Sequence, residues 1–309
     1  MRRGFNKRGY ILIDKKEFER KHSIAIARLR NFCANKKVLC AFSGGKDSQS
    51  CYHLLEESGM PFTAQYSITR FEPKELLEFI HRVYPNITYR RAYKCSLVED
   101  IARHGLPTMF NRWCCNAKHV KTEGFDIAVI GVRAEESSRR AARWRSFGQK
   151  QDRTYYCCPI IDWTSEDVWY YLNEIVKVEH CCLYDQGYKR IGCVMCPLSG
   201  VKHMQKDMER YPKVAKLLKI GNDRFVTEYT KRLKANGWLK HNGQPVSPEH
   251  YSRFPNPQEE CWKRWTQTAQ IARTIDHYIK QPKSEESAPC LFAGSGFSES
   301  DGLDMEDKE

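Results

Sequence analysis

The sequence predicts an α/β protein in which a twisted parallel sheet carries helices on both faces, followed by a smaller helical C-terminal appendage. Two observations lead to this prediction. Short apolar runs alternate with segments of helical periodicity, and strands that alternate with helices form parallel sheets with right-handed crossovers. In addition, the 309 residues suffice for one α/β domain of about 200 residues and an appendage.

Apolar periodicity, turn residues and capping residues set the bounds of the expected elements. Strands are expected at 38–42, 62–68, 87–92 and 126–132, and helices at 16–33, 47–58, 73–84, 97–104 and 165–176. Gly59 ends one helix, Pro73 opens another, and Thr164 caps the last. Because ligands of such sheets lie beyond the carboxyl ends of the strands, the strand ends at Ser43 and Gly131 should meet at one cleft.

Composition divides the chain into four regions. Residues 1–36 are expected to form an N-terminal helical cover, and residues 37–200 the sheet domain. Residues 201–280 contain tryptophans among lysines and arginines and are interpreted as a basic helical appendage. Residues 281–309 are rich in Ser, Glu, Gly and Asp with few large apolar side chains, which predicts a disordered acidic tail.

The net charge of the chain is +13 at pH 7 although its tail is acidic, so the remainder is strongly basic. Such a surface attracts polyanions, which makes a nucleic acid or a phosphorylated nucleotide the expected partner; a solvated basic surface without a partner is the alternative. No apolar stretch approaches the roughly 20 residues that span a bilayer, and no secretory signal is readable. We therefore expect a cytoplasmic protein that binds no membrane.

The segment Ser43-Gly44-Gly45-Lys46-Asp47-Ser48 lies between an apolar run and an expected helix. A strand that turns through a glycine-rich loop into a helix can bind phosphate, because the first helical N–H groups and the helix dipole face the loop. Gly44 and Gly45 allow the backbone to approach phosphate oxygens. Lys46 adds a positive charge, Asp47 could hold Mg²⁺, and Ser43 and Ser48 add hydroxyl donors.

Fourteen cysteines in a chain of this size, without an export signal, favour metal binding or sulfur chemistry over a disulfide scaffold. Cys114 and Cys115 are adjacent, and Cys193 and Cys196 form a CxxC. A disulfide between neighbours would be strained, so the two pairs are interpreted as four thiolate ligands. Adjacent cysteines are awkward for tetrahedral zinc, which favours a [4Fe–4S] cluster; buried structural cysteines are the alternative.

The loop 43–48 resembles the PP-loop of the ATP pyrophosphatases, the adenine nucleotide alpha hydrolase or HUP-like superfamily, which holds the pyrophosphate part of ATP or an equivalent anion. From about residue 37 to 200 the chain is similar to one family of that superfamily, the phosphoadenosine phosphosulfate (PAPS) reductases. The motifs that carry the resemblance, in order, are the loop 43–48, Cys114-Cys115, Gly131–Arg139, Pro159–Thr164 with Asp167–Trp169, and Leu183–Tyr188 leading into Ile191–Cys196.

The resemblance implies roles for particular residues. It places Gly131, Arg133 and Arg139 at the phosphates of the nucleotide beside the loop 43–48, in agreement with the paired hydrogen bonds that guanidinium groups make to phosphate oxygens. The catalytic candidates are Lys46, Asp47 and Arg133. The cysteine pairs look like those of assimilatory adenylyl sulfate reductases, where four cysteines bind a [4Fe–4S] cluster beside the nucleotide. The roles of Arg140, Arg143 and Arg145 stay open between phosphate contact and surface charge.

One departure from the family bears on the reaction. True reductases attack the sulfate sulfur with a cysteine in a Glu-Cys-Gly-(Leu/Ile)-His context near the C-terminus. In this chain the only late cysteine, Cys290, follows Ala-Pro and precedes Leu-Phe, in an acidic segment that disfavours a thiolate.

The expected function is therefore an iron–sulfur PP-loop enzyme that binds ATP with Mg²⁺, releases pyrophosphate and adenylylates an acceptor for sulfur transfer. The expected acceptor is a nucleic acid, as in tRNA thiolation or DNA phosphorothioation, with a sulfur donor such as a cysteine desulfurase. One alternative is a reductase that forms sulfite from adenylyl sulfate (APS) or PAPS with thioredoxin. A third reading is a non-catalytic nucleotide and iron–sulfur sensor.

Overall fold

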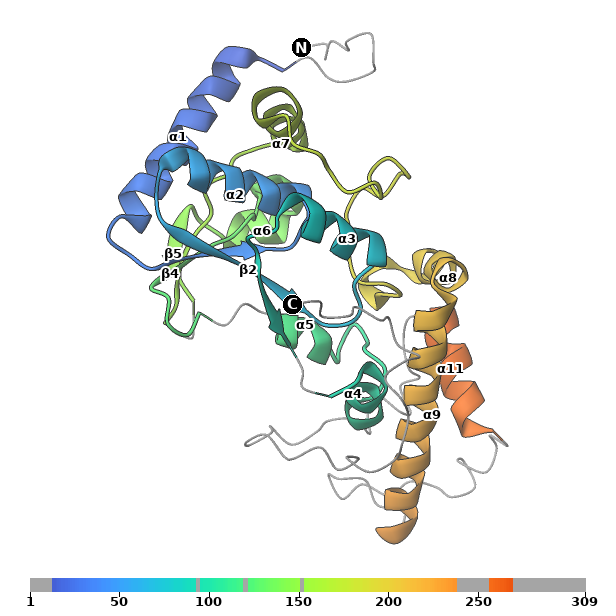
Figure 1. Cartoon of the computed structure of the whole chain (residues 1–309). Helices are drawn as coiled ribbons and strands as arrows, with labels where there is room; N and C mark the ends of the chain where they lie inside the picture. Colours follow the sequence, from blue (N-terminus) through green and yellow to red (C-terminus); the bar gives the residue numbers. More distant parts are fainter. Residues whose placement is uncertain (1–12, 93–94, 119–121, 151–152, 238–255, 269–309) are drawn as a thin grey trace. The chain divides into compact units, whose positions relative to one another are not determined.

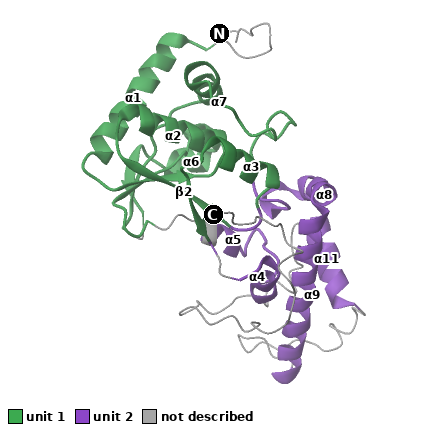
Figure 2. Ribbon diagram, viewed as in Figure 1, with its two compact units in different colours: residues 1–68, 72–91, 118–191 green, residues 69–71, 92–117, 192–309 purple. Residues whose placement is uncertain are grey.

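The structure is a computed structural model that describes residues 13–92, 95–118, 122–150, 153–237 and 256–268 (Figure 1). It divides into two compact units that interleave along the chain (Figure 2). Unit 1 comprises residues 1–68, 72–91 and 118–191, and unit 2 comprises residues 69–71, 92–117 and 192–309. The expected N-terminal cover belongs to unit 1, and the segments around both cysteine pairs belong to unit 2. The expected acidic tail, 281–309, lies outside the described residues.

The sheet belongs to unit 1, and within the described residues it has six strands in the order β3-β2-β1-β4-β6-β5. These are β1 (Val38–Phe42), β2 (Phe62–Ile68), β3 (Thr88–Arg91), β4 (Ile127–Val129), β5 (Phe147–Gln149) and β6 (Tyr155–Cys157). The pairings among β1, β2, β3, β4 and β6 are parallel, whereas β5 pairs antiparallel to β6. The predicted α/β fold with a parallel sheet is confirmed, and β5 adds one antiparallel strand at its edge.

The helices of unit 1 follow the predicted alternation. They are α1 (Lys15–Cys33), α2 (Lys46–Ser58), α3 (Lys74–Val83), the 3₁₀ turn η1 (Ala134–Glu136), α6 (Ser138–Arg143), α7 (Ser165–Tyr170) and the π-helical turn η2 (Tyr171–Val176). Gly59 ends α2 in the left-handed conformation, as its position predicts. The expected helix 165–176 changes from α to π at Tyr171, a change for which the sequence pattern gives no sign.

Burial on both sides of β1 explains why its sequence is a continuous apolar run. Val38, Cys40 and Phe42 point to one face and belong to the main core, which includes residues of α1, α2 and α3. Leu39 points to the opposite face and is also fully buried. A strand that is covered on both faces cannot show the alternating pattern of a half-exposed strand.

Unit 2 is helical and has its own apolar core. Its elements are α4 (Leu97–His104), α5 (Trp113–Lys118), the 3₁₀ turn η3 (Pro197–Ser199), α8 (Val201–Arg210), α9 (Pro212–Ala235) and α11 (Pro257–Thr268). The helices α4 and α9 pack closely because α9 carries a glycine where they meet. A Cβ at Gly221 would lie 2.7 Å from Cβ of Ile101. None of the described helices in either unit has both the length and the apolar character needed to cross a membrane.

Candidate nucleotide-binding site

The loop that joins β1 to α2 depends on one of its two glycines for its shape. Gly44 has a φ of +70°, and a Cβ there would lie 2.7 Å from side-chain atoms of Leu76 and Ile80. Gly45 is the N-cap of α2 with a φ of −78°, which any residue can adopt. Of the two glycines, only Gly44 therefore adopts a conformation that favours glycine.

Hydrogen bonds within the loop hold it in place. The N–H of Ser43 donates to Oγ of Ser48 at 3.1 Å, and the Ser48 hydroxyl donates to the carbonyl oxygen of Gly45 at 2.8 Å. The side-chain amide of Gln49 donates to the carbonyl oxygen of Gly44 at 3.2 Å. Ser48 was predicted to offer its hydroxyl to a ligand, but the structure uses that hydroxyl inside the loop. The result is a preorganised turn at the start of α2.

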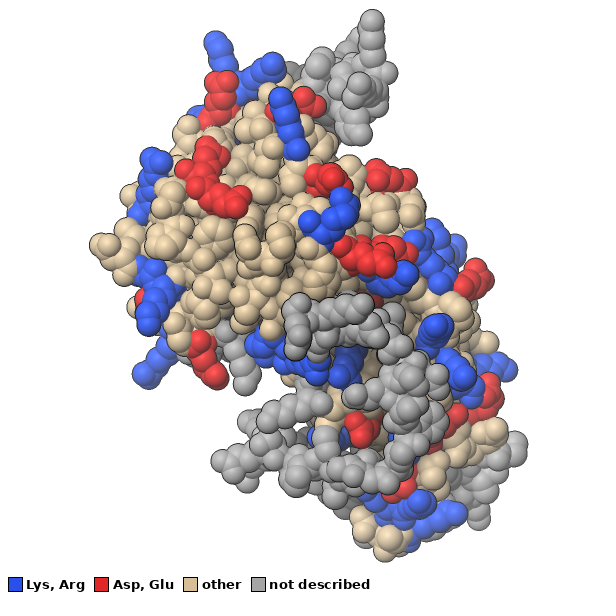
Figure 3. All heavy atoms as spheres, in the orientation of Figure 1, with Lys and Arg blue, Asp and Glu red and all other residues tan. Residues whose placement is uncertain are grey.

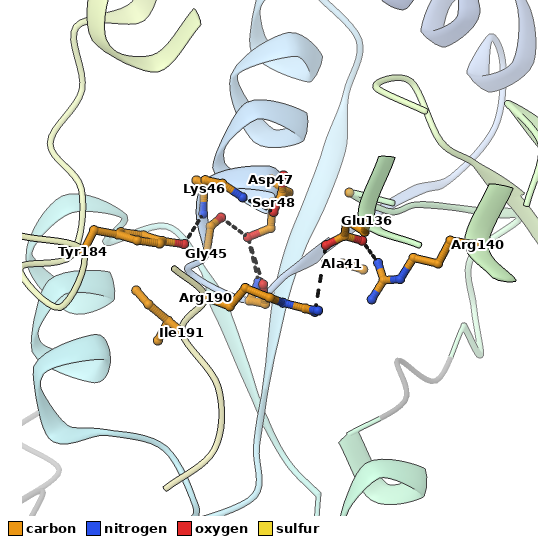
Figure 4. A pocket seen from close by; sticks show the side chains of 12 residues that line it. Ala41, Gly45, Lys46, Asp47, Ser48, Glu136, Arg140, Tyr184, Arg190 and Ile191 are labelled. Atoms are coloured by element: carbon orange, nitrogen blue, oxygen red, sulfur yellow. Dashed lines mark hydrogen bonds and ion pairs between the residues drawn. The ribbon is translucent and has the colours of Figure 1, made fainter. Parts of the chain in front are cut away.

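A pocket of about 200 Å³ lies at this turn, within unit 1 (Figure 4). Its lining consists of Ala41, Ser43, Gly45, Lys46, Asp47, Ser48, Gly131, Glu136, Arg140, Tyr184, Arg190 and Ile191. The volume is below the roughly 300–1,000 Å³ of sites that enclose a drug-sized ligand. The pocket therefore suits the anionic part of a nucleotide rather than the whole molecule.

The predicted convergence of two strand ends on one cleft is confirmed. Gly131, which follows β4, lines the same pocket as the loop that follows β1. A Cβ at Gly131 would lie 2.7 Å from the carbonyl oxygen of Asp47, in the first turn of α2. Only glycine allows these two backbones to approach so closely.

Three of the predicted site residues form one charged network, and two of them, Lys46 and Asp47, line the pocket. Nζ of Lys46 lies 3.0 Å from one carboxylate oxygen of Asp47, and Nε of Arg133 donates to the other at 2.6 Å. Arg133 also donates to Glu135 at 2.5 Å, and the Glu135 carboxylate accepts the N–H of Ser165 at 2.7 Å. The side chains of Lys46 and Arg133 are each only 5% exposed. This network fixes the Lys46 side chain at the N-terminus of α2.

Burial weakens the hold of Lys46 on its proton. Desolvation lowers the pKa of its ammonium group, and the Asp47 carboxylate opposes that shift. An incoming phosphate would bring negative charge to the same place and favour the protonated form. A bound anion would therefore offset the desolvation of the Lys46 ammonium group.

The arrangement around Asp47 does not fit the predicted Mg²⁺ ion. Each carboxylate oxygen of Asp47 already accepts a hydrogen bond from a cationic side chain, Lys46 or Arg133. A divalent cation prefers open carboxylate and carbonyl oxygens, and here it would meet two positive charges at its first ligand. In this structure Asp47 positions two cations instead.

Four polar residues that sequence reasoning did not assign to the site, Glu136, Arg140, Tyr184 and Arg190, also line the pocket (Figure 4). Glu136 forms an ion pair with Arg140, and one of its oxygens lies 3.9 Å from Arg190. The hydroxyl of Tyr184 accepts the N–H of Lys46 at 3.0 Å. Both Tyr184 and Arg190 lie far along the chain from the loop, and only the resemblance of segment 183–188 to the family drew attention to that region.

The two predicted arginines beyond Gly131 lie in different surroundings. Arg133 does not line the pocket itself, but it holds Asp47 from below. Arg139 is exposed and does not line this pocket, whereas its neighbour Arg140 does. The helix α6 explains the difference, because consecutive residues on a helix point about 100° apart. Arg140, whose role the sequence left open between phosphate contact and surface charge, is the arginine of α6 that lines the pocket.

The two cysteine pairs both belong to unit 2. Cys114 and Cys115 lie on α5, and Cys193 and Cys196 flank a turn whose backbone is held by Asp207, which accepts the N–H of Met195 at 2.8 Å. All four thiols are half-buried and none forms a disulfide. The pKa of Cys114 is raised, first by its hydrogen bond with Cys115 and by burial, and also by the nearby Cys193 and Cys196.

Thiols are the donors of iron–sulfur and zinc centres, and Cys114 and Cys193 pack against the apolar core of unit 2. Across the described ranges, no group of three or more His, Cys, Asp or Glu side chains has the geometry of a metal site. Cys290, the residue weighed as a reductase nucleophile, lies outside the described residues.

Comparison with known proteins agrees with the resemblance of the motifs. A family model for the phosphoadenosine phosphosulfate reductase domain matches residues 37–199, which is more than half of the chain. An uncharacterized protein of Methanocaldococcus jannaschii is 30% identical over 222 residues, covering 66% of this chain and 45% of that protein. An adenosine 5'-phosphosulfate reductase of Shouchella clausii is 27% identical over 191 residues, covering 58% of this chain and 79% of that protein.

The chain spans about half the length of the two M. jannaschii proteins to which it is similar. Among solved structures, the phosphoadenylyl-sulfate reductase of Candida auris is similar at a TM-score of 0.43 and 16% identity. The superposition covers 60% of this chain and 98% of the reductase chain. The match of the family model, which includes the nucleotide-binding loop and both cysteine pairs, establishes the family: the chain belongs to the phosphoadenosine phosphosulfate reductase domain family.

Proposed function

We propose that this protein binds ATP with its pyrophosphate part in the pocket at the start of α2, and that it adenylylates an acceptor with release of pyrophosphate. The observation that carries the proposal is the pocket itself. It combines the N-terminus of α2, the buried Lys46 and the guanidinium groups of Arg140 and Arg190 around an anion-sized space. Such a set of fixed donors and charges suits two linked phosphates.

The residues of the pocket account for the proposed step. An acceptor oxygen attacks the α-phosphorus of ATP, the bond from that phosphorus to the bridging oxygen breaks, and the electron pair leaves with pyrophosphate. Lys46, Arg140 and the first N–H groups of α2 would stabilise the charge that builds on the departing pyrophosphate. Asp47 and Arg133 act as positioning residues, since they hold Lys46 in place. No step is assigned to Mg²⁺, because Asp47 is already paired with two cations.

We propose that Cys114, Cys115, Cys193 and Cys196 hold a [4Fe–4S] cluster in unit 2. When bound, such a cluster offers either redox chemistry or an iron atom that can carry a sulfur ligand. The chain would supply four thiolates from two pairs, and the pKa of Cys114 responds to the other three cysteines. We further propose that the acceptor is a nucleic acid, which the net charge of +13 supports, and that a persulfide-bearing protein such as a cysteine desulfurase supplies the sulfur.

A second candidate function is reduction of adenylyl sulfate to sulfite with thioredoxin. The observation that favours it is the similarity to several proteins named adenosine 5'-phosphosulfate reductase, including that of S. clausii. The sequence around Cys290 argues against it, because that cysteine lacks the Glu, Gly and His context of a reductase nucleophile.

One experiment separates the two functions. Anaerobically purified protein is supplied with ATP, with and without total RNA or DNA, and the release of AMP and pyrophosphate is measured. In parallel, sulfite release is measured from APS and PAPS with thioredoxin. We expect pyrophosphate release that falls roughly 100-fold or more in Lys46→Met and is unchanged in Lys74→Met, whose side chain is exposed. Rapid sulfite release that is abolished by Cys290→Ser would overturn the proposal.

The proposed cluster has its own test. Anaerobically purified protein should be brown and contain iron and acid-labile sulfide, and Cys193→Ala should remove both. Cys182→Ala serves as a matched control, because Cys182 is an exposed cysteine of unit 1. A colourless protein that carries zinc instead would contradict the cluster assignment.

A further inference from the structure

The connection between α4 and α5 in unit 2 exposes two apolar side chains. Phe110 is 80% exposed and Met109 is 42% exposed, although the residues just before them, from Gly105 to Thr108, are buried. Phe110 is the most exposed large apolar side chain in the described part of the chain. Single exposed apolar residues are common on protein surfaces, so exposure alone does not mark a binding site.

The second observation is that hydrogen bonds hold the backbone of this turn on either side of Phe110. Oγ1 of Thr108 accepts the N–H groups of Phe110 at 3.2 Å and of Asn111 at 2.9 Å. The N–H of Thr108 donates to the carbonyl oxygen of Asn111 at 3.0 Å, and the Asn111 side chain donates to the carbonyl oxygen of His104 at 3.2 Å. The turn is therefore closed by hydrogen bonds on both sides of Phe110.

Two buried tryptophans anchor the base of the same turn. Nε1 of Trp113 donates to the carbonyl oxygen of Gly105 at 3.0 Å, and Nε1 of Trp265 donates to the carbonyl oxygen of Pro107 at 2.7 Å. Both indole rings are part of the apolar core of unit 2. Phe110 is therefore exposed on a turn whose backbone is already held in place, so binding of a ligand there orders little further backbone.

The same turn also holds a cation. Nε of Arg112 donates to the carbonyl oxygen of Met109 at 2.8 Å, which holds the guanidinium group next to the turn. The Arg112 side chain is exposed, so its terminal N–H groups face solvent. A flat aromatic surface and an adjacent fixed guanidinium match the two parts of a nucleotide, its base and its phosphate.

We propose that residues 105–112 form a nucleobase-binding turn, in which an unpaired base of the acceptor nucleic acid stacks on Phe110 while its phosphate contacts Arg112. The occupant is a single strand, because the faces of paired bases are already covered by their neighbours in a duplex. The turn leads directly into Cys114 and Cys115, so a bound base is held next to the proposed metal ligands. The inference rests on the proposed function for the identity of the nucleic acid as acceptor.

The long helix α9 of the same unit supplies charge for the rest of the strand. Lys213, Lys216, Lys231 and Lys234 are all exposed, and of these Lys231 pairs with Glu228 at 2.8 Å. Lys213 and Lys231 lie a whole number of helical turns apart, as do Lys216 and Lys234, so the four share one side of the helix. A line of lysines contacts a phosphate backbone without regard to sequence, which complements the base contact at Phe110.

The test measures binding of fluorescein-labelled oligonucleotides by anisotropy, without ATP. The probes are a single-stranded RNA, a single-stranded DNA of the same sequence, the matching duplexes, and a DNA strand in which the bases are replaced by abasic sites. The variants are Phe110→Ala, Phe110→Trp and Arg112→Ala. Tyr155→Ala is the matched control, because Tyr155 is an aromatic residue of unit 1 that is 42% exposed.

We expect Phe110→Ala to weaken binding of at least one single strand roughly fivefold or more, with no such loss on the abasic strand. Phe110→Trp should restore affinity, and Arg112→Ala should weaken binding of the ordinary and abasic strands alike. The comparison of RNA with DNA then identifies the kind of acceptor. The melting temperature of each variant shows whether it is folded, and Phe110→Ala is expected to fold because the Phe110 side chain is 80% exposed and buries little surface.

Three results would overturn the inference: no binding of any single strand by the wild-type protein, equal affinity of Phe110→Ala and wild type, or the same loss on the abasic strand. The second result would instead favour a protein partner at this turn. Pyrophosphate release from ATP is measured separately, so failure of the proposed ATP reaction and failure of the proposed base contact are told apart.

Discussion

At the scale of single residues, two adjacent glycines contribute differently to one loop. Gly44 needs its missing side chain, because its φ is positive and the space around it is filled by Leu76 and Ile80. A Cβ at Gly45 would find only ordinary contacts, the nearest with the Tyr184 hydroxyl at 3.5 Å. A sequence motif shows two identical letters here, and only the backbone angles tell them apart.

This difference gives a prediction for the pair. Gly44→Ala should lower the free energy of unfolding by about 1–3 kcal/mol, since it combines a left-handed backbone with overpacking. Gly45→Ala should change it by less than about 0.5 kcal/mol in the absence of ligand. Urea unfolding followed by circular dichroism measures both. Equal destabilisation by the two substitutions would show that the loop has another conformation.

Lys46 should make anion binding depend on pH. Its folded-state pKa is below the ordinary 10.5, so between that lowered value and 10.5 the unfolded chain holds the proton more firmly than the folded one. In that window the contribution of Lys46 to folding stability rises with pH, while the charge that attracts phosphate is lost. Pyrophosphate affinity measured by calorimetry should therefore fall as pH rises toward 10.5, and Lys46→Met should remove this decline. A decline that persists in Lys46→Met would assign it to another group.

At the scale of elements, much of the sheet was readable from the sequence. The strands β1 and β2 have the predicted bounds, because each is an apolar run between clear turn residues. The strands β5 and β6 were missed, since three residues are too few to show a period, and the pairings of β6 with β4 and of β5 with β6 are tertiary contacts. Element type was therefore predictable where the local pattern decides it.

The candidate site was only partly readable for a related reason. The loop after β1 was identified because its chemistry lies within six consecutive residues. Glu136, Tyr184 and Arg190 join it from distant segments, and no local pattern marks them as partners of that loop. The choice between Arg139 and Arg140 required the orientation of α6.

The contact between α1 and α7 gives a prediction at this scale. The Asp167 carboxylate accepts the N–H of Thr164 at 2.8 Å as part of a capping box and also pairs with Lys21 of α1 at 2.7 Å. Asp167→Ala should lower the free energy of unfolding by about 2–4 kcal/mol, because it removes the cap and leaves a mostly buried lysine without its partner.

Asp162→Ala is the control for this change. Asp162 pairs with Arg28 of the same helix α1, but its side chain is 34% exposed, so the expected loss is about 1 kcal/mol or less. Both variants are compared by urea denaturation at pH 7. A larger loss in Asp162→Ala than in Asp167→Ala would contradict this account of how α1 is held.

At the scale of the whole molecule, the positive charge should dominate its encounters with nucleic acid. Lys and Arg side chains are visible across the face shown in Figure 3. The affinity for a single strand should fall as salt rises, with the logarithm of the association constant linear in the logarithm of salt concentration. The slope reports how many phosphates the protein contacts.

The salt dependence of binding by variants distinguishes the phosphate contacts from the stacking contact. Arg112→Ala should reduce the slope by about 1, because it removes one phosphate contact. Phe110→Ala should lower affinity at every salt concentration and leave the slope as it is. Anisotropy titrations over a range of potassium chloride concentrations supply the data. A change of slope in Phe110→Ala would mean that this residue orders the charged groups rather than stacking on a base.

The pairing of Glu136 with Arg140 and Arg190 has a consequence for which anions this protein admits. Within the pocket, Glu136 already balances part of the positive charge of Arg140 and Arg190, so an entering anion must compete with this carboxylate. Chloride would trade one negative charge for another and gain little by doing so. A chain of phosphates brings several charges at once and also reaches the helix N–H groups, which Glu136 does not bond. Glu136 should therefore weaken the binding of monovalent anions such as chloride more than the binding of polyphosphates.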